Sequence, residues 1–406
     1  MAKLTPIRAT RPEAARALDT SSVPYDVVST EEARALAAGN PLSFLHVTRS
    51  EIDLPADTDP YSDQVYELAR ENFARLRREA PLVADVEPSL YLYRLRMGEH
   101  VQTGVAGAWS LDEYDHDRIK KHEKTRRDKE DDRTRHITTL RAQTGIVFLT
   151  YRASNTVDGI VARASRETPL YDFVSADGVA HTMWRVDDEA RDRLVAAFAA
   201  VPDLYIADGH HRAASAARAS QALTDPSTVA NAGDRRTFLA VAFPDHQMNV
   251  LPYHRAVRDL NGRDPGTFLA ELGSRFESVQ GPPQPVEAGR FSVYVAGRWS
   301  TFLLPPVAEA SPIARLDCAR LQESVLAPLL GIGDPRTDKR IDFIGGIRGT
   351  TELERRVDSG EAAVAFALFP VSVEDLFAVS DAGEIMPPKS TWFEPKLRDG
   401  LLVHEI

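Results

Sequence analysis

One stretch near the middle of the chain, residues 204–212, constrains the fold more than any other. Its four apolar residues, 204–207, predict a short buried strand. The Asp208-Gly209 pair that follows predicts a tight turn, because glycine adopts backbone conformations that a side chain hinders. The alanine-rich run after this stretch predicts a helix. The first helical turn then carries the side chains of His210, His211 and Arg212.

This predicted helix start has the features of a phosphate site. The first N–H groups of a helix lack intrahelical partners and carry a partial positive charge, which favours an anion. Gly209, His211 and Arg212 are therefore candidate phosphate-binding residues, and Arg212 adds a forked donor. Asp208 and His210 are candidate catalytic groups. In the alternative interpretation, Asp208 serves only as the N-cap of the helix and the histidines are solvated.

Composition limits the classes of protein to which the chain can belong. Its 406 residues, 43% hydrophobic and 27% charged, suffice for two or three soluble domains. The net charge of -11 argues against a general nucleic-acid or acidic-membrane binder. The single cysteine, Cys318, excludes an internal disulfide and a cysteine-based zinc site. No apolar run has the length of a signal peptide or a membrane span, which predicts a cytoplasmic protein.

Residues 115–136 are dense in both charges and almost without apolar side chains. We expect a charged helical insertion here, supported by opposite charges four residues apart. Such a segment is usually a solvated surface helix. The functional alternative is a wall over a polar substrate, with several side chains of one helical face turned inward. The inward-facing candidates are His122 and Glu123 as catalytic groups and Arg126 and Arg133 as phosphate-binding groups.

The remaining pattern predicts a mixture of helices and strands in two domains. Residues 1–258 are expected to form the nucleotide-binding α+β domain and residues 259–406 a smaller α+β domain whose tail packs back onto the body. Several local elements carry these expectations. They are a capping box at Ser29 and Glu32, a strand at 43–47, a helix at 62–79, a hairpin at 89–107, strands at 146–151 and 237–243, a polar loop at 224–236 and a helix at 264–276.

Several short motifs, spread over nearly the whole chain, together resemble a widespread family known as domain of unknown function 1015. The core motif is the Asp-Gly-His-His-Arg sequence at 208–212. The others are Pro24-Tyr25-Asp26-Val27, Asn40-Pro41 with Ser43-Phe44-Leu45, His122-Glu123-Lys124-Thr125, Pro252-Tyr253-His254-Arg255 and Pro388-Lys389-Ser390-Thr391. The core motif is also similar to the phosphate-binding box of the ParB and sulfiredoxin-like superfamily. This resemblance implies a ParB/sulfiredoxin-like mixed sheet with helices.

Free serine kinases of that superfamily carry a similar Asp-Gly-His box. The resemblance therefore implies nucleotide-dependent phosphoryl transfer to a small hydroxyl compound, with free L-serine as the leading candidate and Mg²⁺ with ATP or ADP as the cofactor. Helix-start N–H groups would hold phosphates, a carboxylate would orient the attacking hydroxyl, and no Walker or kinase-type glycine-rich loop is present. Lys389, Ser390 and Thr391 are further candidates for binding the nucleotide or substrate.

Other interpretations stay open at this stage. A non-catalytic nucleotide-binding regulator would use the same pocket without an acceptor hydroxyl. A phosphoester hydrolase would use the histidine pair. Zinc on that pair is disfavoured because adjacent helical side chains point about 100° apart. DNA binding, as in ParB, is disfavoured by the acidic balance, and a homodimer stays open.

Overall fold

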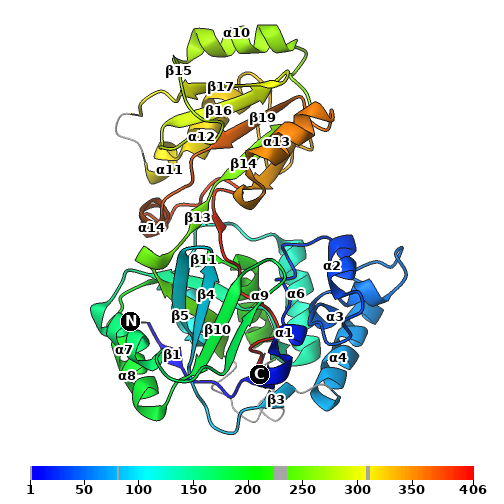
Figure 1. The fold of residues 1–406 in the computed structure, drawn as a ribbon, viewed down its shortest axis with the longest axis vertical. Helices are drawn as coiled ribbons and strands as arrows, with labels where there is room; N and C mark the ends of the chain where they lie inside the picture. Colours follow the sequence, from blue (N-terminus) through cyan, green and yellow to red (C-terminus); the bar gives the residue numbers. More distant parts are fainter. Residues whose placement is uncertain (1, 80–81, 224–235, 308–310) are drawn as a thin grey trace. The chain divides into compact units, whose positions relative to one another are not determined.

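The computed structural model describes residues 2–79, 82–223, 236–307 and 311–406 (Figure 1). It divides the chain into a first unit, residues 1–248 with 395–406, and a second unit, residues 249–394. The expected boundary at residue 258 falls later than this division. The reason is that β14 (Tyr253–Val257) pairs with two strands of the second unit's sheet. The expected polar loop at 224–236 lies outside the described residues except at its last position.

The first unit is built on a nine-stranded mixed sheet in the order β6-β11-β8-β12-β5-β4-β10-β9, with β1 paired to β5. The β11–β6 and β12–β8 pairs are parallel and the other pairs are antiparallel. The strands are β1 (Leu4–Thr5), β4 (Tyr91–Met97), β5 (His100–Ser110), β6 (Ile119–Lys120), β8 (Val147–Tyr151), β9 (Tyr171–Val174), β10 (Ala180–Arg185), β11 (Leu204–Asp208) and β12 (Thr237–Pro244).

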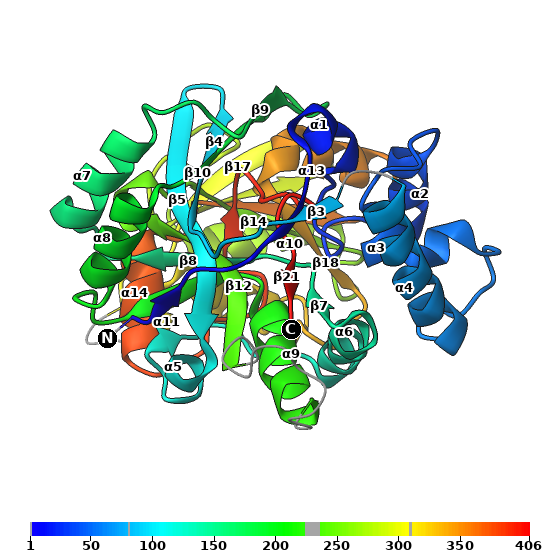
Figure 2. The ribbon, with the colours of Figure 1, turned by 90° about the horizontal axis from the view of Figure 1, so that it is seen from below.

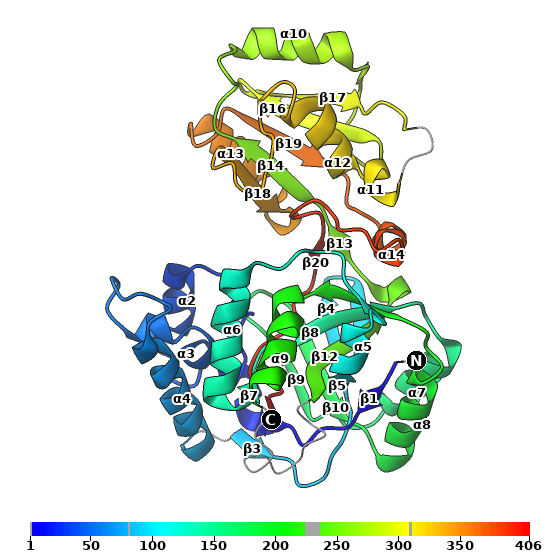
Figure 3. The same cartoon turned by 180° about the vertical axis from the view of Figure 1, so that it is seen from behind.

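Helices α7, α8 and α9 cover one face of this sheet. Phe238, Ala240 and Ala242 alternate along β12 and so share a face, and they belong to one apolar cluster with Phe198 of α8 and Ala213 of α9. Figure 3 shows α9 beside α6, and Figure 2 shows α4 and α3 on the outer side of α6. These helices are α3 (Leu45–Thr48), α4 (Asp63–Arg78), α6 (Arg127–Leu140), α7 (Asn155–Ala164), α8 (Asp188–Phe198) and α9 (His210–Ala222).

Most local predictions for the first unit agree with the structure. The Ser29–Glu32 capping box opens α2 (Thr30–Ala37), and the predicted helix at 62–79 is α4. The prediction of a strand at 43–47 is wrong, because these residues lead into and begin the short helix α3. Phe44 is fully buried and packs edge-to-face on Phe73 of α4, so the apolar run reflects burial and not a strand.

The charged segment does not form one helix over 115–136. Helix α5 (Leu111–Asp115) precedes it, β6 interrupts it, and α6 begins only at Arg127. The reason is Ile119, which is fully buried and pairs in parallel register with Leu204 of β11. Residues 121–126 therefore leave the sheet beside the end of β11 as a loop.

The second unit has a six-stranded antiparallel sheet in the order β15-β17-β16-β19-β14-β18. Its strands are β13 (Val250–Leu251), β14, β15 (Ser278–Val279), β16 (Arg290–Val295), β17 (Arg298–Leu303), β18 (Ile341–Gly345), β19 (Val364–Leu368) and β20 (Trp392–Phe393). Its helices are α10 (Pro265–Arg275), α11 (Pro312–Arg315), α12 (Asp317–Leu321), α13 (Gly349–Asp358) and α14 (Val373–Asp381). Both units therefore combine helices with sheets, and the fold class is α+β.

The C-terminal segment, residues 395–406, returns to the first unit. Its strand β21 (His404–Glu405) pairs with β7 (Ala142–Gln143), and Ser22 and Asp399 exchange two backbone hydrogen bonds of 3.0 Å. The aromatic residues of β20 just before this segment pair with β13 inside the second unit. Across the described ranges, we find no helix with the length and apolar character needed to cross a membrane.

Candidate functional site

The strand, turn and helix predicted at 204–222 are present. Strand β11 ends at Asp208 with a register shift against β8, and α9 begins at His210. Gly209 lies between them at φ +92°, in the left-handed region that favours glycine. Gly209 is also the N-cap. Asp208 precedes the N-cap, and its carboxylate accepts a 2.9 Å hydrogen bond from the N–H of Gly209. The interpretation of Asp208 as a simple N-cap is therefore wrong.

The loop at 121–126 lies against the start of α9. The N–H of His122 donates to Nε2 of His210 over 3.3 Å, and the N–H of Arg126 donates to Nε2 of His211 over 3.0 Å. The rings of His122 and His210 meet edge-to-face at 4.4 Å. Because Nε2 of His210 accepts, its proton is on Nδ1, which faces Oε2 of Glu123 at 3.8 Å. The structure thus brings His122, Glu123 and His210 together, and the Asp208 carboxylate acts on both histidines, so all four predicted catalytic residues lie at this turn.

Burial makes the two inner histidines neutral. His122 and His210 are 3% and 4% exposed. Burial lowers the pKa of His122 to about 4 and lowers that of His210 well below its ordinary value, although the Asp208 carboxylate opposes both shifts. The interpretation of His210 as a solvated side chain is therefore wrong. At neutral pH neither ring is a cation that could balance phosphate charge.

Lys396 supplies a cation that the sequence interpretation missed. Its Nζ donates to Oδ2 of Asp208 over 2.8 Å, and the two side chains are 16% and 29% exposed. The residues are 188 positions apart. Lys396 reaches the turn because the C-terminal segment returns to the first unit. The partly exposed part of the site therefore holds one amine and two carboxylates, those of Asp208 and Glu123.

Arg212 has partners other than the predicted phosphate. Its side chain lies over Gly145 and Gly209, where an added Cβ would come within 3.2 and 3.3 Å of its Cδ. Nη1 donates to the carbonyl of Ile146 over 2.7 Å, and Nη2 donates to both carboxylate oxygens of Asp26 over 2.7 and 2.8 Å. Only 5% of Arg212 is exposed. The Asp26 of one quoted motif thus neutralises the Arg212 of another.

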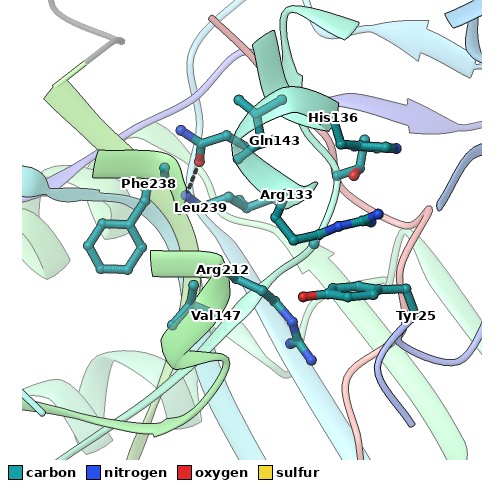
Figure 4. Close-up of a pocket in the computed structure, with 12 residues that line it drawn as sticks. Tyr25, Arg133, His136, Gln143, Val147, Arg212, Phe238 and Leu239 are labelled. Carbon is teal, nitrogen blue, oxygen red and sulfur yellow. Dashed lines mark hydrogen bonds between the residues drawn. The ribbon is translucent and has the colours of Figure 1, made fainter. Parts of the chain in front are cut away.

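Tyr25 lies between Arg212 and the predicted phosphate-binding residue Arg133 (Figure 4). Its ring centroid is 4.3 Å from the Arg133 guanidinium and 5.8 Å from that of Arg212. Arg133 is itself paired with Asp132 at 2.9 Å. These groups border a cavity of about 20 Å³, a volume on the order of that of one water molecule and too small for a nucleotide.

The other predicted phosphate-binding residues lie elsewhere. The Arg126 side chain is 70% exposed and pairs with Asp128 at 2.7 Å, so only its backbone joins the helix start. Lys389, Ser390 and Thr391 belong to the second unit. There Lys389 lies over the ring of Tyr253. Whether these three residues bind a nucleotide stays a prediction.

A buried carboxyl, that of Asp399, accompanies the Arg212–Asp26 pair. Asp399 is 1% exposed, and its Oδ2 has no hydrogen-bond partner among the described residues. Burial raises its pKa to about 7, a shift that the charge of Arg212 opposes and that of Asp26 increases. The Asp399 carboxyl therefore titrates near neutral pH in the folded protein.

We expect Asp399→Asn to stabilise the protein at pH 8 and to stabilise it less, by under half as much, at pH 5. The unfolded carboxyl releases its proton near pH 3.8 and the folded one near 7, so wild-type stability falls as pH rises through this window. The full difference is on the order of 4 kcal/mol. Thermal unfolding of both proteins at pH 5 and 8 measures it. The exposed Asp192→Asn is the control, and an equal melting temperature of Asp399→Asn and wild type at pH 8 would contradict the expectation.

Comparison of this chain with known proteins shows the family to which it belongs. Solved structures similar to this chain include a free serine kinase in complex with AMP, with 13% identity, a TM-score of 0.36, and coverage of 74% of this chain and 91% of that one. Another is C-terminally truncated SbnI from Staphylococcus aureus, with 15% identity, a TM-score of 0.38, and coverage of 74% and 87%. No curated protein matches the sequence. A sequence model of the family described as "Protein of unknown function (DUF1015)" matches residues 4–319, and the chain belongs to that family.

Proposed function

We propose that this protein transfers a phosphoryl group from a nucleotide to the hydroxyl of a small compound at the start of α9, with free L-serine as the leading acceptor. The observation that carries the proposal is that two carboxylates lie at this helix start. Glu123 faces His210, and Asp208 is bound by Lys396. Phosphoryl transfer requires mainly positioning and charge neutralisation, together with a carboxylate that orients the attacking hydroxyl.

Each part of the site has a role in this proposal. The first N–H groups of α9 and the Lys396 amine hold the phosphates. The Glu123 carboxylate, 38% exposed, accepts the proton of the acceptor hydroxyl. The Nδ1 of the neutral His210 faces the Glu123 carboxylate at 3.8 Å, which places that carboxylate at the helix start. Arg212 is a positioning residue, since Asp26 and Ile146 occupy its guanidinium.

Mg²⁺ is the expected companion of the nucleotide. Glu123 and Asp208 offer the carboxylate oxygens that this ion prefers, and it takes its other ligands from phosphates and water. No group of three or more metal-ligating side chains occurs in the described part of the chain, so the protein alone would contribute few ligands. Bound there, Mg²⁺ would neutralise phosphate charge. The carboxylate and the amine, which belong to the chain, keep the roles given above.

A binding and product assay tests the proposal. We expect one of ATP, ADP, CTP or pyrophosphate, with Mg²⁺, to raise the melting temperature, and L-serine then to give a new phosphomonoester signal in phosphorus NMR. Lys396→Met should weaken nucleotide affinity about tenfold through loss of a charge-assisted contact. Lys129→Met, on α6 and in contact with Tyr61, is the matched control.

The outcomes separate the alternatives. Stabilisation without product from any hydroxy compound would favour the nucleotide-binding regulator. Release of phosphate from a phosphoester without a nucleotide would favour the hydrolase. Absence of stabilisation by all four compounds would exclude a phosphate site at this helix start and the proposal with it.

A further inference from the structure

The second unit contains a buried arginine that has no counter-ion among the residues described in the structure. Arg255 lies in β14 and is 3% exposed. Its Nη1 donates a hydrogen bond of 2.8 Å to the carbonyl of Tyr253, and its guanidinium lies 4.7 Å from the ring centroid of Phe343. Among the described residues it forms no ion pair. Other buried arginines of the chain, such as Arg212 and Arg398, each pair with an aspartate.

This arrangement is costly for a structural residue. A buried charge without an opposite charge or a full set of hydrogen bonds is strongly unfavourable, and a cation–π contact recovers only about 0.5–2 kcal/mol. Burial lowers the pKa of Arg255, whose neighbouring titratable groups are Cys318 and Tyr253 and include no acid. The guanidinium has five N–H donors, so most of them are available to an acceptor that the protein does not supply.

The groups around Arg255 are suited to an anion. Asp317, the acid nearest in sequence to Cys318, is already held by Arg320 at 2.9 Å and by the N–H of Gly289. Burial raises the pKa of the Cys318 thiol, which keeps it protonated and uncharged at neutral pH. The Cys318 Sγ lies 3.2 Å from the hydroxyl of Ser390.

A second cation lies on the same neighbour. Lys389 is exposed, and its Nζ is 5.6 Å from the ring centroid of Tyr253, the residue whose carbonyl receives Arg255. Lys389 also forms no ion pair among the residues that the structure describes. Arg255 and Lys389 thus bring two positive charges to Tyr253, and among the described residues no carboxylate forms an ion pair with either of them. Two charges match a phosphate dianion.

We propose that the second unit binds the phosphate group of a small phosphoester or inorganic phosphate, with Arg255 as its buried donor and the exposed Lys389 at its entrance. This site lies within the second unit and does not depend on the activity proposed for the start of α9. It gives a ligand-binding role to the Pro252–Arg255 and Pro388–Thr391 motifs, each of which provides one of the two cations.

Thermal unfolding in the Lys396→Met background tests the site, since that change removes the cation of the candidate site in the first unit. We expect 10 mM inorganic phosphate or glycerol 2-phosphate to raise the melting temperature by about 2–4 °C at constant ionic strength. Potassium acetate, a monoanion, should give no comparable rise. A response to phosphate alone would identify the free ion as the ligand, and a response to both would identify the phosphate group.

Two further variants locate the effect. Adding Arg255→Met should abolish the phosphate-dependent rise without lowering the melting temperature in its absence, because no ion pair is lost. Adding Arg320→Met should lower the starting melting temperature, because it breaks the pair with Asp317, and should retain the rise. A phosphate response that is equal with and without Arg255, or the absence of any response in the parent, would overturn the proposal.

The only cysteine provides a local measurement in the wild-type protein. Phosphate bound at Arg255 should slow modification of Cys318 by methyl methanethiosulfonate severalfold, because the charge of the guanidinium acts on that thiol and a bound anion would oppose formation of the reactive thiolate. This measurement requires no variant to fold. An unchanged modification rate at 10 mM phosphate would also overturn the proposal.

Discussion

Glu123→Gln is expected to reduce phosphoryl transfer by about 10²–10⁴-fold and to leave nucleotide affinity within about threefold of wild type. The amide keeps the size of the carboxylate and removes its capacity to take a proton from the acceptor hydroxyl. Because the phosphates are assigned to the helix N–H groups and to Lys396, binding should survive. Turnover with saturating L-serine and nucleotide, together with a nucleotide titration, measures both quantities.

A surface carboxylate on a neighbouring helix gives the matched control. Glu67 lies on α4, is 56% exposed and pairs with Arg70, so Glu67→Gln makes the same chemical change away from the helix start. Its turnover should equal that of wild type. Wild-type turnover in Glu123→Gln would exclude Glu123 as the general base. A loss of nucleotide affinity without a loss of turnover at saturation would instead assign Glu123 to nucleotide binding.

Local sequence signals were sufficient for the elements that carry the site. An apolar run identified β11, helical periodicity identified α4, and glycine chemistry identified the turn at Gly209. They failed where burial overrode the local pattern. The apolar run at 43–47 is a buried helical turn, and one residue in the charged segment, Ile119, enters the sheet and prevents a continuous helix.

The pairs that define the site could not be predicted from spacing. Lys396 and Asp208 are 188 residues apart, and Arg212 and Asp26 are 186 apart. No periodicity encodes such contacts, because they depend on how the C-terminal and N-terminal segments fold onto the sheet. The short motifs quoted for the family were the best signal available, since three of them, at 24–27, 122–125 and 208–212, meet in the first unit. Lys396 lies outside all of them.

The contacts of Arg212 change what its replacement should do. Arg212→Ala is expected to lower the free energy of unfolding of the first unit by about 3–5 kcal/mol, because it leaves the carboxylate of Asp26 and the carbonyl of Ile146 without their buried partner. This corresponds to a fall of about 10 °C in the melting temperature. A loss of activity in this variant would therefore report a displaced helix start and not the loss of a phosphate contact.

A mutant cycle separates the ion pair from other effects of the change. Asp26→Leu alone leaves the buried guanidinium uncompensated, and Arg212→Met with Asp26→Leu removes both charges together. We expect the double variant to be more stable than the sum of the single losses predicts, because neither charge is left unpaired. Arg236→Ala, which removes an arginine that is 41% exposed and paired with Asp112 and Asp115, should cost no more than about 1 kcal/mol. If Arg212→Ala were as mild as Arg236→Ala, the pairing with Asp26 would not hold the start of α9, and Arg212 would again be a candidate for binding phosphate directly.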